Sequence, residues 1–169
     1  MGKHKSKSTD LESDKEAGSP PPMETTDSQD TTAADDSRSY EELVTLVNAI
    51  AKPMANKKLT KKLYKAVKKA QKAKRLKRGV REVVKGLRKN EKGVVVLAGD
   101  VSPIDVISHI PVFCEEKGVP YCYVPSRKDL GAAALTKRPT SVVIIQLNEE
   151  YKKLYDECYS AVDALPLPI

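Results

Sequence analysis

The sequence is poor in the residues from which many binding sites are built. None of its 169 residues is Trp and only Phe113 is Phe. A platform for stacked bases would therefore have to come from Tyr residues, and no aromatic strand of the kind that reads RNA is visible. The three Cys residues are odd in number and not in CxxC spacing, which argues against a disulfide framework and a zinc site. We expect Cys114, Cys122 and Cys158 to be reduced, buried thiols of a cytosolic or nuclear protein.

A recognisable catalytic constellation is also missing. His4 lies in a polar N-terminal stretch, His109 stands alone, and the sequence supports no Ser or Cys nucleophile beside either. Asp100, Asp105 and Asp129 fall at expected turns and helix starts, where capping and the helix dipole explain them. There is no Gly-rich phosphate loop, no apolar run of membrane length and no secretory pattern. We expect no enzymatic activity, no cofactor and no metal.

Positive charge, by contrast, is abundant and concentrated. The chain carries 30 Lys and Arg against 23 Asp and Glu, a net charge of +7. Residues 1–39 hold five basic and nine acidic side chains, whereas residues 52–92 hold 18 basic and two acidic ones, Glu82 and Glu91. A block this long and one-sided is the electrostatic footprint of a protein that binds a polyanion, and nucleic acid is the first candidate.

The chain divides into an acidic tail and one folded domain. Residues 1–38 have almost no large apolar side chain and should be disordered. Residues 39–169 alternate helical patterns with short apolar runs, which predicts an α/β fold, a three-layer α/β/α sandwich with a small mixed sheet. The expected elements are a helix with Thr60 as N-cap, a helix opening at Gly79, strands at 94–98, 121–124 and 141–147, helix starts at Ser102 and Ser126, a loop at 135–140 and a final helix after Asn148.

Residues 77–89 predict a helix with two different faces. An apolar stripe and a cationic stripe follow helical spacing on opposite sides. Gly79 stands where the helix begins, so its backbone amides can approach an anion without an intervening side chain. One face fits a core and the other fits phosphate. The apolar stripe is Val80, Val83, Val84 and Leu87, and the cationic stripe is Arg81, Lys85, Arg88 and Lys89.

Longer motifs resemble a known family. The string GVREVVKGL is followed by LAGD, then CEEKGVPY, then VPSRKDLG and SVVII. This series is similar to the ribosomal protein seven-Ae and thirty-e superfamily of kink-turn RNA binders. Within it, LTKKLYK, KRPT and the terminal LPLP look like the members that belong to H/ACA small nucleolar ribonucleoproteins.

The resemblance implies the same α/β/α fold and a non-catalytic, RNA-binding role in RNA-guided pseudouridylation of ribosomal RNA. The implied partners are an H/ACA guide RNA, a dyskerin-type pseudouridine synthase and a small adaptor subunit, docked through a less basic face. In animals the same core also belongs to telomerase ribonucleoprotein. The implied location is the nucleus and nucleolus, with no membrane contact.

The family's RNA-reading positions can be carried over residue by residue. Gly79, Glu82 and Lys85 are retained, whereas Arg81 stands where the family usually has Asn. An Asn amide both donates and accepts, while Arg only donates, so phosphate attraction should persist and base-specific reading should weaken. The loop at 135–140 departs from the family's apolar pattern and is better suited to backbone contact. The expected RNA-binding residues are Lys77, Arg78, Gly79, Arg81, Glu82, Lys85, Arg88, Lys89, Leu135, Lys137 and Arg138.

Several alternatives remain open at this point. Glu82 at the third position of the helix can stabilise the helix dipole and pair with Lys85 without any RNA. The same fold could belong to a ribosomal or box C/D kink-turn protein with autonomous, specific recognition. A protein-interaction module like the superfamily's stress-response members is a third reading, although those members are acidic.

Overall fold

The strands in the described part of the chain form one four-stranded mixed sheet. The computed structural model describes residues 39–166. The expected acidic tail lies outside that range. Strands β2 (Gly93–Ala98) and β3 (Tyr121–Val124) run parallel, and β4 (Val142–Gln146) is antiparallel to both β2 and β1 (Leu76–Arg78). The strand order is β1-β4-β2-β3.

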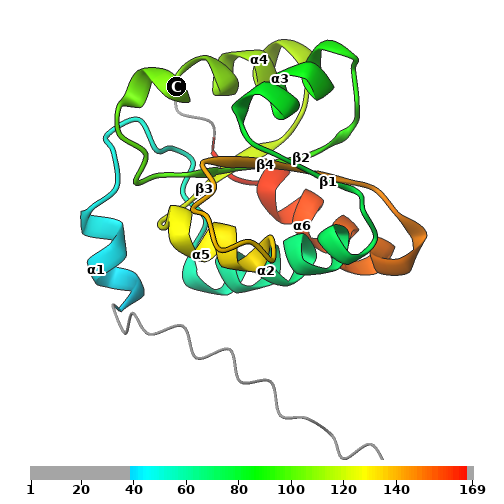
Figure 1. The fold of residues 1–169 in the computed structure, drawn as a ribbon, viewed down its shortest axis with the longest axis horizontal. Coiled ribbons are helices and arrows are strands. Elements are labelled where there is room, and N and C mark those ends of the chain that lie inside the picture. The colour runs from blue at the N-terminus through cyan, green and yellow to red at the C-terminus, as the bar shows by residue number, and fades with distance from the viewer. Residues whose placement is uncertain (1–38, 167–169) are drawn as a thin grey trace, which may run out of the picture. The chain divides into compact units, whose positions relative to one another are not determined.

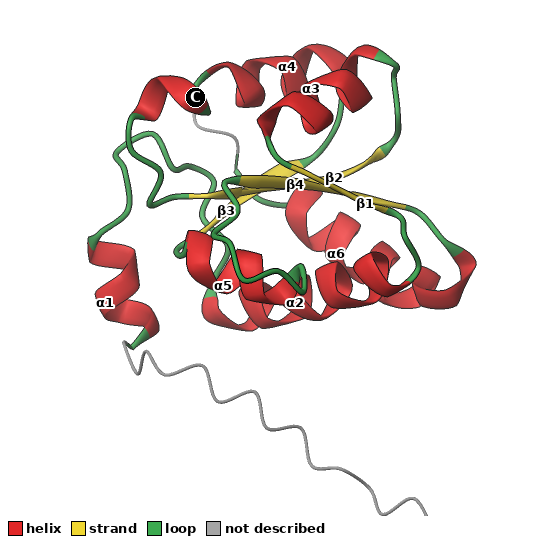
Figure 2. Ribbon diagram, in the orientation of Figure 1, coloured by secondary structure: helices red, strands yellow, loops and turns green. Residues whose placement is uncertain are grey.

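Helices cover both faces of this sheet, which confirms the predicted three-layer sandwich. Figures 1 and 2 show α3 and α4 on one face and α2, α5 and α6 on the other. The helices are α1 (Tyr40–Thr45), α2 (Lys57–Lys72), α3 (Val80–Arg88), α4 (His109–Lys117), α5 (Arg127–Ala133) and α6 (Lys152–Asp163), with single 3-10 turns η1 (Ile104–Val106) and η2 (Glu149–Tyr151).

The core lies where the apolar runs of the sequence predict it. Every residue of β2 and β3 is buried, as continuous apolar strands covered on both faces should be. The expected thiols are buried as well, and all three are free. Burial raises the pKa of Cys114 to about 12 and that of Cys158 to about 11. Both thiols are therefore protonated at neutral pH and poor nucleophiles.

Two predicted helix starts are wrong. Helix α2 begins one turn earlier than expected, because Asn56 is its N-cap and its side chain accepts the N–H of Leu59 at 3.0 Å. Thr60 instead lies buried inside the helix, and its hydroxyl donates to the carbonyl oxygen of Ala55 at 3.2 Å. The start expected at Ser102 is only the short turn η1, and α4 begins at His109. The start expected at Ser126 is confirmed, since its hydroxyl accepts the N–H of Asp129 at 3.3 Å.

Strand β1 was not predicted. The expected helix at 77–89 begins at Val80, because Lys77 and Arg78 pair with Ile144 and Val143 of β4. The remaining strands fall where the apolar runs place them, and α6 follows η2 after Asn148.

The two edges of the sheet differ in what limits further strand pairing. β1 is only three residues long. At the other edge, the N–H of Tyr123 in β3 donates to the Pro53 carbonyl at 2.9 Å, and the Ala55 N–H donates to the Tyr123 carbonyl at 2.9 Å. Residues 53–55 therefore cover β3 along its outer side without forming a regular strand.

Candidate nucleic-acid interface

The N-terminus of α3 is open and held in place by the sheet. Gly79 has φ 89° and ψ 151°, a conformation that is essentially restricted to glycine. Its N–H donates to the Val142 carbonyl at 2.8 Å, so the pairing of β1 with β4 fixes the point where α3 begins. No side chain caps this helix. Its first-turn amides and the positive end of its dipole are thus available to an anion.

The residues of the predicted apolar stripe of α3 lie in two different environments. Val83 and Leu87 are fully buried in the core. Val80 and Val84 are only half-buried, and together with His109 of α4 they line a groove of about 540 Å³. The other side chains that line this groove are Arg81, Glu82, Lys85 and Arg88.

Charge on α3 is strongly positive and is not neutralised within the helix. Arg81, Lys85, Arg88 and Lys89 are all exposed. Glu82 is exposed as well, and among residues 39–166 it forms no ion pair, so the pairing with Lys85 that spacing allows is absent. The carboxylate of Glu82 is therefore available as a hydrogen-bond acceptor among the basic side chains that line the groove.

Lys77 has a structural partner that the sequence did not reveal. Its ammonium group contacts Glu91 at 2.5 Å, and the amide of Gln146 donates to the same carboxylate at 2.6 Å. The hydrogen bond from Lys77 lowers the pKa of Glu91. Lys77 thus fastens β1 to the turn after α3. Arg78 has no such partner among the described residues and lies exposed beside the start of α3.

The loop at 135–140 is confirmed and lies at the same end of the sheet as Gly79. The Ala98 N–H donates to the Ser141 carbonyl at 2.8 Å, directly before the contact of Gly79 with Val142. A Cβ on Gly131 would meet the Arg138 carbonyl oxygen at 2.4 Å, so only glycine allows the loop to pack this closely on α5. Leu135 is 51% exposed with φ 53°, and Lys137 and Arg138 are exposed.

The structure therefore brings most of the predicted site residues together. Gly79, the exposed side chains of α3 and the groove are contiguous, and the loop follows the same end of the sheet. Val80, Val84 and His109 were missed as groove residues. Helical spacing places the two valines on α3, but it assigns them to the core. No sequence signal places His109 there, because its position depends on where α4 begins.

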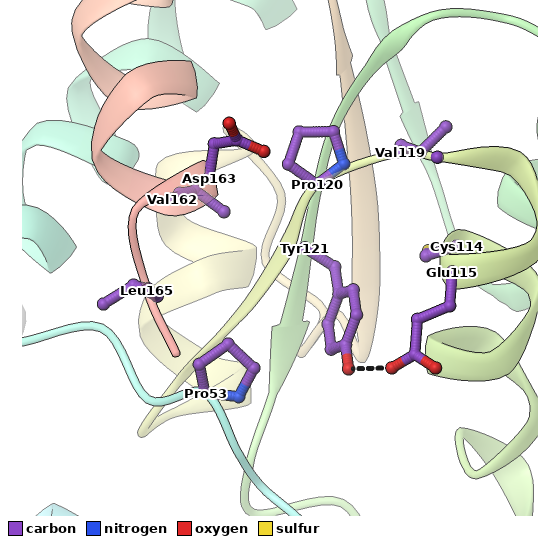
Figure 3. Close-up of a pocket in the computed structure, with 10 residues that line it drawn as sticks. Pro53, Cys114, Glu115, Val119, Pro120, Tyr121, Val162, Asp163 and Leu165 are labelled. Atoms are coloured by element: carbon purple, nitrogen blue, oxygen red, sulfur yellow. Dashed lines mark hydrogen bonds between the residues drawn. The ribbon is translucent and has the colours of Figure 1, made fainter. Parts of the chain in front are cut away.

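A second hollow lies at the β3 edge. It measures about 240 Å³ and lies among Pro53, Cys114, Tyr121 and Leu165 (Figure 3). The Tyr121 hydroxyl donates to Glu115 at 2.8 Å, and burial raises the pKa of that hydroxyl. Both groups are thus engaged with each other, and the neighbouring thiol is protonated.

Residues 39–166 contain no cluster of three or more His, Cys, Asp or Glu side chains that could hold a metal ion. None of the helices described is sufficiently long and apolar to span a bilayer.

Comparisons with known proteins identify the family of this chain and a solved structure of similar fold. Residues 61–155 match the sequence model of the Ribosomal protein L7Ae/L30e/S12e/Gadd45 family. The Xenopus laevis protein named H/ACA ribonucleoprotein complex subunit 2-like protein is 60% identical over 132 residues, 78% of this chain and 89% of that protein. The Bos taurus H/ACA ribonucleoprotein complex subunit 2 is 54% identical over 132 residues, 78% of this chain and 86% of that protein. A solved structure, the Giardia lamblia 15.5kD RNA binding protein, is 32% identical with a TM-score of 0.68, and covers 71% of this chain and 100% of that one.

Proposed function

The chain belongs to the Ribosomal protein L7Ae/L30e/S12e/Gadd45 family, and from that premise we propose that it is a non-catalytic, RNA-binding subunit of the H/ACA ribonucleoprotein complex. The names of its relatives from Xenopus laevis and Bos taurus support the assignment to that complex. The observation that carries the RNA-binding role is the uncapped N-terminus of α3, which opens beside a groove lined by Arg81, Lys85 and Arg88.

The chemistry of this site favours positioning of RNA over reading of bases. The first-turn amides of α3 and three basic side chains all donate hydrogen bonds, and phosphate oxygens accept them. Glu82 is the single carboxylate in the groove, so it is the group that can accept from a base edge. Val80 and Val84 supply an apolar floor against which a sugar or an unstacked base can pack.

The finer assignment follows from the same proposal. The subunit would hold guide RNA in register for pseudouridylation of ribosomal RNA, with a dyskerin-type synthase supplying the chemistry and a small adaptor linking the two. The less basic face of the domain would dock that adaptor. Residence in the nucleus and nucleolus, and membership of telomerase ribonucleoprotein in animals, belong to this proposal too.

Affinity purification with and without RNase tests the assignment to the complex. We expect the tagged chain to recover H/ACA guide RNA and a pseudouridine synthase. The protein partners should persist after RNase if the adaptor docks directly. Recovery of ribosomal or box C/D RNA, with no pseudouridine synthase, would contradict the proposal in favour of the kink-turn alternative.

Charge removal tests the surface itself. Substituting Gln for Arg81, Lys85 and Arg88 should weaken RNA binding and flatten the dependence of log affinity on log salt by roughly 0.7 per lost phosphate contact on single strands. A variant with Gln at Lys92, Lys117 and Lys152 removes the same charge elsewhere and is the control. Equal effects of the two variants would mean that net charge, and not this groove, governs binding.

A further inference from the structure

Helix α2 concentrates positive charge on the face of the sheet opposite to α3. Its 16 residues include eight lysines and no carboxylate. It packs with α5 and α6, whereas α3 packs with α4 on the other side (Figure 1). The basic block that reads as continuous in the sequence is therefore split by the sheet into two separate surfaces.

Six of the eight lysines of α2 fall into two groups according to their surroundings. Those on the flank toward α6 meet acidic neighbours. Lys62 pairs with Glu157 at 3.0 Å, and Lys69 borders a hollow that Glu149, Glu150 and Asp156 also line. Their charge is thus locally balanced.

A second group points away from the core. Leu63, Val67 and Ala70 face the sheet and are fully buried, so the opposite side of the helix carries the residues at Lys58, Lys61, Lys65 and Lys72. We name these four the outer lysine row. All four are exposed, and none forms an ion pair with another residue of the range 39–166.

A row of this kind is unfavourable in a helix that has no ligand. Like charges three or four residues apart repel each other on a helix surface, and Lys58, Lys61 and Lys65 follow that spacing without a carboxylate to relieve it. Surfaces that serve only solubility usually intersperse both signs. A bound polyanion removes the repulsion.

We infer that the outer lysine row is a second RNA-backbone surface, which binds an RNA segment independently of the α3 groove. The inference rests on the proposed RNA-binding function and extends it to a second contact. From Lys58 to Lys72 the row spans about 21 Å at 1.5 Å per residue. Ammonium groups only donate hydrogen bonds, so the row contacts phosphates and reads no bases. Because the sheet separates the two surfaces, the chain holds two RNA segments apart at a fixed distance.

Stoichiometry with a short RNA tests this inference. The probe is an RNA hairpin whose stem is no longer than the row, so that one copy cannot reach both faces. Native mass spectrometry at low salt should find two hairpins on the full chain. It should find one on the variant with Gln at Lys58, Lys61, Lys65 and Lys72. The dependence of log affinity on log salt should flatten by about 3 in that variant, at roughly 0.7 per lost phosphate contact.

The controls separate this inference from the proposed function. Gln has nearly the helix propensity of Lys, and the thermal midpoint checks that the variant folds. A second variant, with Gln at Lys62, Lys69, Lys152 and Lys153, removes equal charge from the α6 side and should still bind two hairpins. The α3 variant with Gln at Arg81, Lys85 and Arg88 should bind one.

The possible outcomes distinguish a failure of the second surface from a failure of the proposed function. If the full chain binds one hairpin and only the α3 variant loses it, the second surface does not exist while the proposed function stands. If neither the α3 variant nor the row variant changes RNA binding, the inference and the proposed function are both wrong. If the row variant binds two hairpins with an unchanged salt slope, the row serves a different partner and the inference is overturned.

Discussion

Helices α2 and α3 are both cationic and amphipathic, yet they begin in opposite ways. The first turn of α2 is closed by its own sequence, because the Asn56 side chain accepts the Leu59 N–H. The first turn of α3 starts from Gly79 with no side-chain cap. Beside α3 there is also a groove that contains one carboxylate, Glu82, whereas α2 has none along its length.

This difference separates two requirements of RNA recognition. Positive charge alone attracts a phosphate backbone and fixes no register, as expected for the outer lysine row. Register needs fixed donors at a defined place. Of the two helices compared, α3 is the one with open backbone amides, and the hydrogen bond from Gly79 to Val142 anchors them to the sheet. The two helices therefore resemble each other in composition and differ in what they can specify.

The largest expected effect breaks the scaffold of α3. Val83→Asp places an unpaired charge at a fully buried position and should lower the free energy of unfolding by about 3–5 kcal/mol. Val84→Asp, one residue along and half-buried in the groove, should cost far less. Denaturant unfolding measures both. Equal losses would mean that Val84 belongs to the core and that the groove is closed.

Substitutions at the two helix starts sharpen the comparison. Gly79→Ala should cost about 1–3 kcal/mol, because Ala is strained at this backbone conformation; no atom lies within 4 Å of the added Cβ. RNA affinity should fall as well, since the first turn of α3 shifts. Asn56→Ala should cost about 1 kcal/mol through loss of the cap, with RNA binding at α3 unchanged. An RNA defect in the Asn56 variant equal to that of the Gly79 variant would remove the distinction between the two termini.

Arg81→Asn should turn a phosphate contact into a base-reading one. The amide both donates and accepts, so preference for a kink-turn over a mutated control stem should rise about tenfold, near the lower end of what one bidentate base contact contributes. Arg88→Asn makes the same charge change further along α3 and should leave the preference unaltered. Competition binding with the two RNAs measures the ratio, and no increase in the Arg81 variant would argue that position 81 does not face a base.

The smallest effect concerns the anchor of β1. Lys77 lowers the pKa of Glu91, so the carboxylate stabilises the folded state above its unfolded pKa of about 4.3, and this contribution disappears as pH falls through the lowered folded-state value. Glu91→Gln should therefore cost about 1–2 kcal/mol at pH 7 and much less once the pH lies below both values. Unfolding measured at neutral and acid pH compares it with Glu82→Gln. Since Glu82 lacks an ion pair, that control should differ little from wild type at either pH.

Much of this fold follows from local pattern, and the exceptions have a common cause. Strands β2, β3 and β4 are apolar runs, so burial on both faces makes them visible in the sequence. β1 is Leu76–Arg78, and two of its three residues are charged. Its strand conformation comes from pairing with β4 more than sixty residues later, which no local window contains.

The same distinction applies to the site. The cationic stripe of α3 follows from helical spacing alone, so the sequence is sufficient to predict it. Both Asn56 and Thr60 are good N-cap residues, so the start of α2 is settled by tertiary packing, which buries Thr60. The place of His109 in the groove likewise depends on η1 replacing the first turn of the expected helix. The partner of Lys77 requires the β1 pairing before Glu91 comes within reach.

The short β1 edge and the partly covered β3 edge have a consequence for association between copies of the chain. Under the proposed function, copies of the chain that have not yet joined the complex carry both sheet edges without a partner subunit. An open strand edge in such a monomer recruits other copies and begins a polymer. Here the pairing of Pro53 and Ala55 with Tyr123 occupies the outer hydrogen-bonding groups of β3 at that point, and the opposite edge ends in three residues, two of them basic. Copies free of their partners should therefore have little tendency to pair with one another through these edges.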